Sequence, residues 1–264
     1  MNIPANLGFT AEDIANAVQR RDVIVVIDVL RCCSTIITAL ANSACEVIPT
    51  MTVKEARDLH QKNPDLILAG ERGGIKLKGF DLGNSPLDFS YRRVNGKSIV
   101  LTTTSGSKAI ISSKNAKYVF IGALLNAKAV AKATLNVASQ ENTGISLISA
   151  GTDGYFALED FIGAGAIAQS FPARDVECSD ALLGALLAFQ KARKSITKVL
   201  QSGCHARQLG SLGFEEDIRF CCRLNIFQTV PLFKDETIKP LAKAVERVRR
   251  TSNFQTRARS SISK

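Results

Sequence analysis

The chain has 264 residues, a length that suits one large domain or two small ones. Hydrophobic residues make up 45% of it and charged residues 22%, the usual balance of a globular protein with a packed core. This balance excludes extensive disorder, and 18 Gly and 7 Pro exclude a collagen-like or low-complexity chain.

The formal net charge of +10 is concentrated at the C-terminal end of the chain. Residues 239–264 contain eight basic side chains and one acidic side chain, so they carry seven of the ten net charges. The rest of the chain is therefore nearly neutral, which disfavours nucleic acid as a partner. We expect residues 239–264 to form a solvated basic helix and a frayed tail.

The sequence predicts a cytoplasmic protein without a membrane span. The first residues lack the basic start and apolar core of a secretory signal. The most apolar window, residues 23–40, is interrupted by Asp28 and Arg31, which argues against a spanning helix. The seven Cys are accordingly expected to be reduced thiols. With two His and no CxxC spacing, a Cys/His zinc site is not expected.

Apolar strand-like runs alternate with helical segments along most of the chain. The β-branched run at 23–27 is typical of a strand buried on both faces. The predicted strands are 23–27, 46–48, 66–69, 98–102, 117–121, 145–149 and 229–233. The predicted helices cover 10–20, 32–42, 52–62, 126–139, most of 178–223 and 239–250, with further helices starting near 108 and 158.

This alternation predicts right-handed crossovers and a mainly parallel or mixed sheet with helices on both faces. The Gly-rich passage at 70–86 is expected to be an extended loop or a hairpin. No Pro-, Gly- or Ser-rich boundary divides the chain. We therefore expect one α/β domain over residues 1–238 with a helical C-terminal part, followed by the basic segment 239–264.

Three predicted strands end in polar turns that open helices, at residues 28–35, 102–108 and 149–154. Ligands of open parallel sheets bind beyond the carboxyl ends of the strands, where helix N-termini attract anions. The turn Thr103–Ser107, with Lys108 behind it, suits an oxyanion. An ordinary capped turn explains the same residues equally well, and both interpretations stay open.

Acidic and basic side chains also follow the strands. Asp28 ends a buried strand three residues before Arg31, and Glu71 and Arg72 follow the strand at 66–69. A carboxylate at such a position needs a metal, a basic partner or water, so a local ion pair between Asp28 and Arg31 is the alternative to a binding site. Glu159 and Asp160 would either add carboxylates to a joint site or pair with a helix dipole.

Carboxylates alone would repel a phosphate, but Mg²⁺ between them would turn the same set into a phosphoryl-transfer site. Other phosphate and hydrolase motifs are absent. The chain has no GxxxxGK[ST] loop, no GxGxxG after its first predicted strand and no GxSxG elbow. It also lacks a Cys-x₅-Arg pair, an RHG sequence and the second Asp of the haloacid-dehalogenase type.

Several long segments resemble the 2-phosphosulfolactate phosphatases, in order and over about residues 23–233. They are VVIDVLRCCSTIITAL, LAGERGGIKLKGFDLGNSP, LTTTSGSKAI, SAGTDGYFALEDFIGAGAI and FCCRLNIFQTVPLF. The resemblance implies a three-layer α/β/α sandwich and a Mg²⁺-dependent phosphatase. The family converts 2-phospho-3-sulfolactate to 3-sulfolactate and phosphate on the route to coenzyme M.

The family pattern falls on polar residues of the turns described above. They are Asp28, Arg31, Ser34, Thr35, Glu71, Arg72, Asp81, Asn84, Ser85, Thr103, Thr104, Gly106, Gly151 and Asp160. The chain departs from the pattern at Cys32 and Cys33, where Ala and Thr are usual, at Lys108, where Arg is common, and at Ser105, which replaces a frequent Asn. These departures bear on substrate preference more than on the chemistry.

On this basis we expect a phosphatase that acts on a small anionic phosphate ester. The expected metal ligands are Asp28, Glu71 and Asp160. The expected catalytic residues are Asp28, Arg31, Glu71 and Arg72. The expected substrate-binding residues are Ser34, Asn84, Ser85, Thr103, Thr104, Gly106 and Lys108.

Several alternatives remain open at this point. Attack by a water activated by the metal and a transient aspartyl phosphate on Asp28 both fit the pattern. The substrate is 2-phosphosulfolactate or the phosphate ester of another 2-hydroxy acid. A non-catalytic protein that binds anions or nucleic acid through its basic tail is the alternative from a different class. The oligomeric state is not determined by the sequence, a homodimer being one option.

Overall fold

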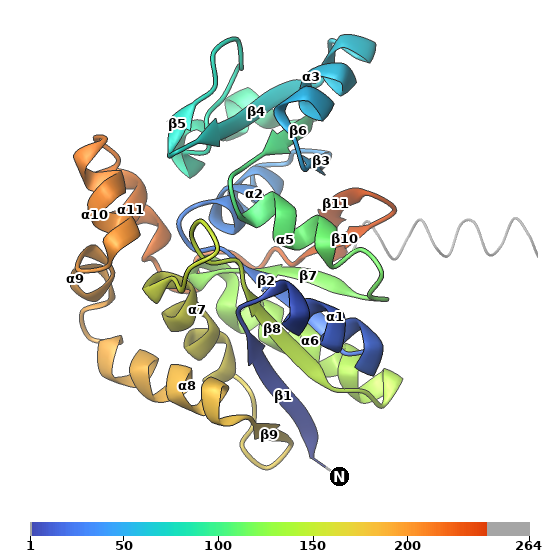
Figure 1. Cartoon of the computed structure of the whole chain (residues 1–264), viewed down its shortest axis with the longest axis vertical. Coiled ribbons are helices and arrows are strands. Elements are labelled where there is room, and N and C mark those ends of the chain that lie inside the picture. Colours follow the sequence, from blue (N-terminus) through green and yellow to red (C-terminus); the bar gives the residue numbers. More distant parts are fainter. Residues whose placement is uncertain (1, 242–264) are drawn as a thin grey trace, which may run out of the picture.

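A computed structural model of the protein describes residues 2–241 (Figure 1). Its centre is an 11-stranded sheet in the order β5-β4-β6-β3-β11-β10-β7-β2-β8-β1-β9. The strands are β1 Ile3–Gly8, β2 Val23–Ile27, β3 Glu46–Thr50, β4 Ile67–Arg72, β5 Ile75–Lys76, β6 Ser98–Thr102, β7 Val119–Gly122, β8 Ile145–Ser149, β9 Val176–Cys178, β10 Pro231–Lys234 and β11 Thr237–Pro240.

The sheet is mixed and consists of two parallel groups joined by a hairpin. Strands β4, β6 and β3 are parallel to one another, and so are β7, β2, β8, β1 and β9. The hairpin β10–β11 lies between the groups and pairs antiparallel with β7 on one side and with β3 on the other. All five residues of β2 are buried, as the β-branched run predicts.

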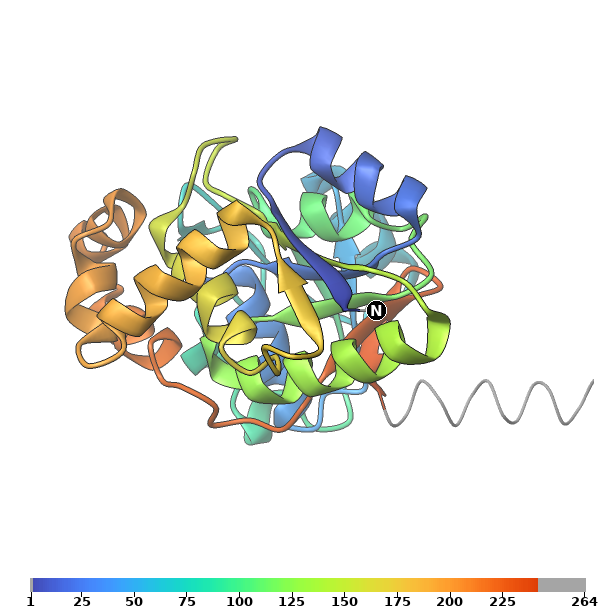
Figure 2. The ribbon, with the colours of Figure 1, turned by 90° about the horizontal axis from the view of Figure 1, so that it is seen from below.

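Helices cover both faces of the sheet. Helices α1 and α5 lie on one face and α6 lies on the other (Figure 2). The helices are α1 Ala11–Arg20, α2 Cys32–Ala41, α3 Val53–Lys62, α4 Tyr91–Val94, α5 Gly106–Ser112, α6 Ala127–Glu141, α7 Leu158–Ala168, α8 Asp180–Ala192, α9 Ile196–Gln201, α10 Cys204–Ser211 and α11 Glu215–Cys221, with 3-10 turns at Pro86–Asp88 and Leu124–Asn126. The expected three-layer α/β/α architecture is confirmed.

The expected helix starts have identifiable causes. Thr10 and Thr52 each accept a hydrogen bond from the backbone N–H three residues on. The carboxylates of Asp13 and Glu55 in turn accept one from the backbone N–H of Thr10 and Thr52, so both starts form capping boxes. Helices α9, α10 and α11 form a group beside the strand ends on the left of Figure 1. Helix α10 of this group forms one wall of the site described below.

The sequence-based prediction was wrong at three places in the sheet. Residues 3–8 and 176–178 are strands that the prediction missed. The segment IPANLG is rich in residues that rarely form strands, and the strand at 176–178 is only 3 residues long. The predicted helix from Lys239 is wrong at its start, because Thr237–Pro240 is strand β11 with Ile238 buried beside Val47. The expected boundary at 238/239 therefore falls inside a strand, and the remaining tail lies outside the described residues.

The Gly-rich passage at 70–86 begins with a short hairpin, in which the end of β4 pairs antiparallel with β5. Of the two predicted structures for this passage, an extended loop or a hairpin, the hairpin is the one found. Within residues 2–241, no helix is both long enough and apolar enough to cross a membrane.

Candidate active site

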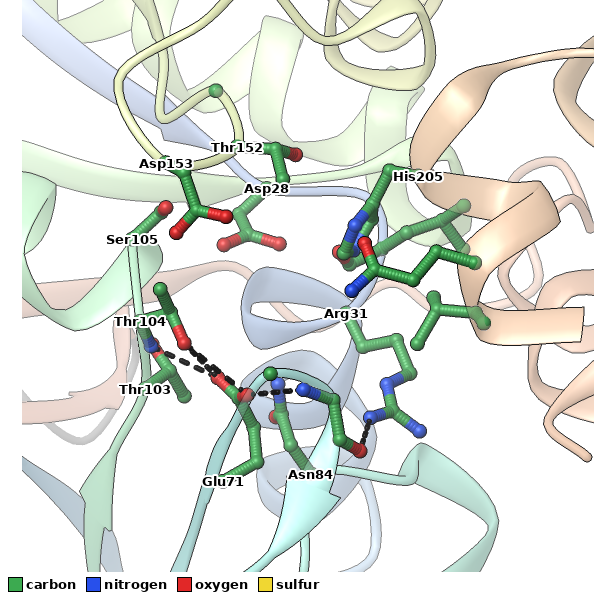
Figure 3. Close-up of a pocket in the computed structure, with 16 residues that line it drawn as sticks. Asp28, Arg31, Glu71, Asn84, Thr103, Thr104, Ser105, Thr152, Asp153 and His205 are labelled. Atoms are coloured by element: carbon green, nitrogen blue, oxygen red, sulfur yellow. Dashed lines mark hydrogen bonds between the residues drawn. The ribbon is translucent and has the colours of Figure 1, made fainter. Parts of the chain in front are cut away.

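A cleft opens beyond the carboxyl ends of β2, β4, β6 and β8, where open parallel sheets bind their ligands (Figure 3). The lining residues are Asp28, Leu30, Arg31, Glu71, Gly73, Gly74, Asn84, Thr103, Thr104, Ser105, Gly151, Thr152, Asp153, His205, Gln208 and Leu209.

Asp28 follows β2 directly and lies at the centre of the cleft. One carboxylate oxygen, Oδ1, accepts a 3.0 Å hydrogen bond from the backbone N–H of Cys32. Burial raises the pKa of Asp28 to about 7, the Cys32 N–H opposes this rise, and the charges of Glu71 and Glu159 add to it. The other oxygen, Oδ2, lies so close to Gly106 that a Cβ atom there would be 2.5 Å away. Gly106 therefore leaves the space that Asp28 occupies.

Arg31 is held by partners distant in sequence. Its Nη1 lies 2.6 Å from Oδ2 of Asp217, and its Nη2 donates a 2.6 Å hydrogen bond to the carbonyl of Gly74. The guanidinium carbon lies 4.1 Å from the centre of the Phe214 ring. The buried ion pair of Arg31 is thus formed with Asp217, and not with Asp28.

Glu71 ties two turns of the cleft together. Oε1 accepts a 2.8 Å hydrogen bond from the N–H of Thr104, and Oε2 accepts one of 2.8 Å from the N–H of Gly74. Both oxygens also lie within hydrogen-bond distance of the Thr104 hydroxyl. Arg72 does not line the cleft, because its guanidinium donates to the Glu71 carbonyl and to the Thr102 hydroxyl.

Thr103, Thr104 and Ser105 line the cleft, and the turn Thr103–Ser107 is closed by its own hydrogen bonds. The Thr103 N–H donates to the Ser107 hydroxyl, and the Ser107 N–H donates to the Thr103 hydroxyl, each over 3.0 Å. These hydrogen bonds agree with the capped-turn interpretation, and oxyanion binding at this turn stays a prediction. Lys108 is exposed and lines a neighbouring groove with Thr104 and Ser105, so it lies outside the cleft.

Asp160 is buried and holds backbone groups. Oδ1 accepts a 2.8 Å hydrogen bond from the N–H of Val29, and Oδ2 accepts bonds from the Gly151 N–H and the Ser149 hydroxyl. Burial raises the pKa of Asp160 well above its usual range, and the charge of Asp28 adds to the rise. Asp160 does not line the cleft. Its contacts fix the turns after β2 and β8 relative to each other.

The three expected metal ligands thus have different surroundings. Asp28 and Glu71 line the cleft, Asp160 lies behind it, and both oxygens of Glu71 and of Asp160 are occupied by N–H groups. Within residues 2–241, no cluster of three or more His, Cys, Asp or Glu is placed to hold a metal ion by itself.

Two of the expected substrate-binding residues support the cleft from behind. The hydroxyl of Ser34 donates to the carbonyl of Val29 over 2.8 Å, and that of Ser85 donates to Oδ1 of Asp217 over 2.6 Å. Neither residue lines the cleft. Their contacts stabilise the turn after β2 and the partner of Arg31.

Asn84 and His205 have polar atoms with unused bonding capacity at the cleft. Oδ1 of Asn84 is buried and has no partner within the described residues, while the Asn84 carbonyl accepts from Thr35. Nε2 of His205 lies 2.9 Å from the carbonyl of Leu30, and because a carbonyl only accepts, Nε2 carries the hydrogen. Nδ1 of His205 is then left without a partner among these residues.

Sequence reasoning missed four residues of the site. Asp153 lies four residues after the end of β8, in the polar turn predicted at 149–154, and that position could have identified it. Its carboxylate faces that of Asp28 (Figure 3). His205, Gln208 and Asp217 belong to α10 and α11, far from the strand ends in sequence, and no local pattern marks them.

The cysteines near the site are buried and suited to packing. Burial raises the pKa of the Cys32 and Cys33 thiols well above their usual range, and the Asp28 charge raises both further. Neither thiol lines the cleft. A protonated, enclosed thiol is a poor nucleophile, so the geometry agrees with a mechanism without thiol chemistry.

A three-layer α/β/α sandwich with a polar cleft beyond its strand ends is typical of α/β proteins that bind a small ligand in that cleft. The model of one family, described as 2-phosphosulpholactate phosphatase, matches residues 9–236. The chain belongs to this family.

Curated relatives agree along most of their length. A probable 2-phosphosulfolactate phosphatase of Clostridium beijerinckii is 38% identical over 233 residues, which cover 87% of this chain and 96% of the relative. Proteins of the same name from Carboxydothermus hydrogenoformans and Thermotoga maritima are 40% and 42% identical, over 84% and 78% of this chain and 90% and 87% of their own length.

Proposed function

We propose that the protein is a phosphoric monoester hydrolase that converts 2-phospho-3-sulfolactate to 3-sulfolactate and inorganic phosphate, with Mg²⁺ as cofactor. The family and the names of its relatives support the reaction. The observation that carries the proposal for this chain is the charge of the cleft. Three carboxylates line it, from Asp28, Glu71 and Asp153, against one guanidinium.

This charge balance favours a bound divalent cation. The guanidinium of Arg31 is already paired with Asp217, so it adds little net positive charge. The proposed substrate carries a phosphate, a sulfonate and a carboxylate, all of which the acidic cleft would repel. A cation of charge +2 offsets this repulsion, and carboxylate oxygens are its preferred ligands.

Asp28 and Asp153 are the residues best placed to hold Mg²⁺. Their carboxylates face each other, and Oδ2 of Asp28 receives no hydrogen bond from a described residue (Figure 3). Mg²⁺ in phosphoryl-transfer sites typically binds one or two carboxylates, the substrate phosphate and several waters. A pair of carboxylates without a third protein ligand fits that chemistry. This pair replaces the set Asp28, Glu71 and Asp160 inferred from the sequence.

Bound there, Mg²⁺ would neutralise the phosphate and make the phosphorus easier to attack. The protein residues then divide the remaining work. Glu71 and Asp160 fix the turns around the cleft through backbone N–H groups. Asp28, whose pKa is raised to about 7, either directs attack by water or forms a transient aspartyl phosphate itself. Acid-quenched single turnovers would trap a phosphorylated protein only in the second case.

Phosphate release from 2-phosphosulfolactate, measured with Mg²⁺ and with excess EDTA, tests the proposal. We expect turnover with Mg²⁺ and loss of turnover with EDTA. No release under either condition would refute the proposal. A panel of other 2-hydroxy-acid phosphates, compared by kcat/KM, would establish the preferred substrate. Salt-dependent nucleic-acid binding that disappears when residues 242–264 are deleted, without phosphate release, would favour the non-catalytic alternative.

A further inference from the structure

The two sides of the cleft differ in chemistry. Asp153 and Ser105 lie on one side, Arg31 and His205 lie on the other, and Asp28 lies between them (Figure 3). In the proposed reaction the phosphate and its cation belong to the side of the facing carboxylates. The rest of the substrate must then extend towards Arg31 and the wall formed by α10.

The Arg31 side chain lines the cleft and is held there by several contacts. Its side chain and that of Asp217 are 2% and 4% exposed, and the two are 186 positions apart in sequence. Both oxygens of the Asp217 carboxylate are engaged, Oδ2 by Nη1 of Arg31 and Oδ1 by the Ser85 hydroxyl, each over 2.6 Å. The Gly74 carbonyl and the Phe214 ring fix the guanidinium from two further directions.

This arrangement leaves part of the guanidinium available to a ligand. Arginine has five N–H donors in a planar fork, and the contacts above use one on Nη1 and one on Nη2. The orientation of the fork is set before a ligand arrives, so binding costs little additional side-chain entropy. Because the ion pair is nearly neutral as a unit, it supplies directional hydrogen bonds more than net charge.

We propose that Asp217 is a positioning residue. It holds the Arg31 guanidinium in the orientation in which the remaining N–H groups of Arg31 bind an acid group of the substrate other than its phosphate. This proposal rests on the proposed function and assigns an orientation to the substrate. The recognised chemistry is a carboxylate or a sulfonate, whose oxygens match the guanidinium fork.

The test compares Asp217→Asn with wild type on three phosphate esters in the presence of Mg²⁺. Two of them, 2-phosphosulfolactate and 2-phospholactate, carry an acid group besides the phosphate, and p-nitrophenyl phosphate carries none. Asn keeps the size of Asp217 but removes the charge that holds Arg31. The matched control is Glu216→Gln, because Glu216 is the exposed neighbour on α11 and pairs only with Arg219 among the described residues.

We expect kcat/KM of Asp217→Asn to fall at least about 10-fold more on the substrates with an acid group than on p-nitrophenyl phosphate, mainly through a higher KM. A loss confined to 2-phosphosulfolactate would identify the sulfonate as the bound group, and a loss on both would identify the carboxylate. Glu216→Gln should match wild type on all three. Equal proportional losses on all three esters, with a lower Tm, would overturn the proposal, because a purely structural role predicts that pattern.

Two further measurements keep the test independent of folding and of turnover. If Asp217→Asn does not fold, Ser85→Ala removes one donor to Asp217 and should show the same substrate dependence with a smaller loss; equal losses overturn the proposal.

If wild type hydrolyses none of the esters, the proposed function fails. Calorimetric binding of 3-sulfolactate and lactate then tests Asp217 alone, since Asp217→Asn should weaken binding while Glu216→Gln does not. Unchanged binding in Asp217→Asn would overturn the proposal.

Discussion

The Asp160 carboxylate accepts a 2.8 Å hydrogen bond from the backbone N–H of Val29, 131 positions earlier in the chain. This bond joins the turn that carries Asp28 to the helix that follows β8. Asp160 therefore supports the site by holding backbone N–H groups, so its substitution should affect stability more than metal binding.

Asp160→Ala should lower stability and weaken the affinity for Mg²⁺ much less than Asp28→Asn does. The substitution removes the acceptor of two N–H groups, those of Val29 and Gly151. The Val29 donor is then left buried without a partner, which costs about 1–3 kcal/mol. Thermal melts would show the loss of stability, and a Mg²⁺ titration of residual activity would show the affinity. A stable variant that needs much more Mg²⁺ would restore Asp160 as a metal ligand.

Asp28→Asn should fold and lose most of its Mg²⁺-dependent turnover. Asn keeps the shape of the side chain and can still accept from Cys32, but it lacks the negative charge needed to hold a cation or to attack phosphorus. We expect a fall of about a thousandfold in kcat, which is about 4 kcal/mol in the activation free energy. A folded variant with near-normal turnover would remove Asp28 from the mechanism.

Asp28 should also make stability depend on pH. Its folded pKa of about 7 lies above the ordinary value of 3.8. Between pH 3.8 and pH 7 the folded state therefore holds a proton that the unfolded state has lost. The stability linked to this proton is complete below about pH 4 and is lost as pH rises towards 7, by about 4 kcal/mol at most.

Urea unfolding without Mg²⁺ would measure this dependence. The advantage in stability of Asp28→Asn over wild type should grow as pH rises from about 4 to about 7. Adding Mg²⁺ at pH 8 should stabilise wild type more than Asp28→Asn, since a ligand of the folded state shifts the unfolding equilibrium. An advantage that does not change with pH would mean that Asp28 is ionised in the folded protein throughout.

Gly106→Ala should disable the site. The new Cβ atom would be 2.5 Å from Oδ2 of Asp28 and 2.5 Å from Cβ of Cys32, so Asp28 or α5 must move. Overpacking of this kind costs about 1–3 kcal/mol, and the displaced carboxylate should lower kcat/KM at least about 100-fold.

Gly210→Ala is the matched control, because Gly210 also lies in a helix and its added Cβ would meet no atom within 4 Å. It should keep full activity and gain about 0.5–1 kcal/mol of stability. Normal activity of Gly106→Ala in steady-state assays would contradict the close packing of Gly106 against Asp28.

The double variant Cys32→Ala/Cys33→Thr should keep near-normal turnover. Both thiols are buried, their pKa values are raised and neither lines the cleft, so they pack α2 against the sheet and take no part in the chemistry. Steady-state kinetics should differ from wild type by only a few-fold. A thousandfold loss in a folded variant would show that the thiol-free mechanism is wrong.

The sequence was most informative where local pattern decides structure. The buried β-branched run of β2 and the polar turns after the strands predicted the sheet and the places of Asp28, Glu71 and Thr103. Pairings between distant segments were out of reach, because local periodicity does not indicate which far residue meets Arg31. For the same reason the first strand of the hairpin β10–β11 was predicted and the second was not. The strand conformation of Lys239 depends on pairing of β11 with β3 and β10, and not on the residues next to Lys239 in sequence.

The hairpin β10–β11 also governs the order in which the protein can assemble. Its residues, 231–240, come last among the described elements, yet they form the strands that join the two parallel groups of the sheet. During synthesis each group can form its own pairings, but the sheet cannot become continuous until residue 240 has left the ribosome. The cleft draws Glu71 and Thr104 from one group and Asp28 and Asp153 from the other. Its final geometry is therefore set only when residues 231–240 have joined the two groups.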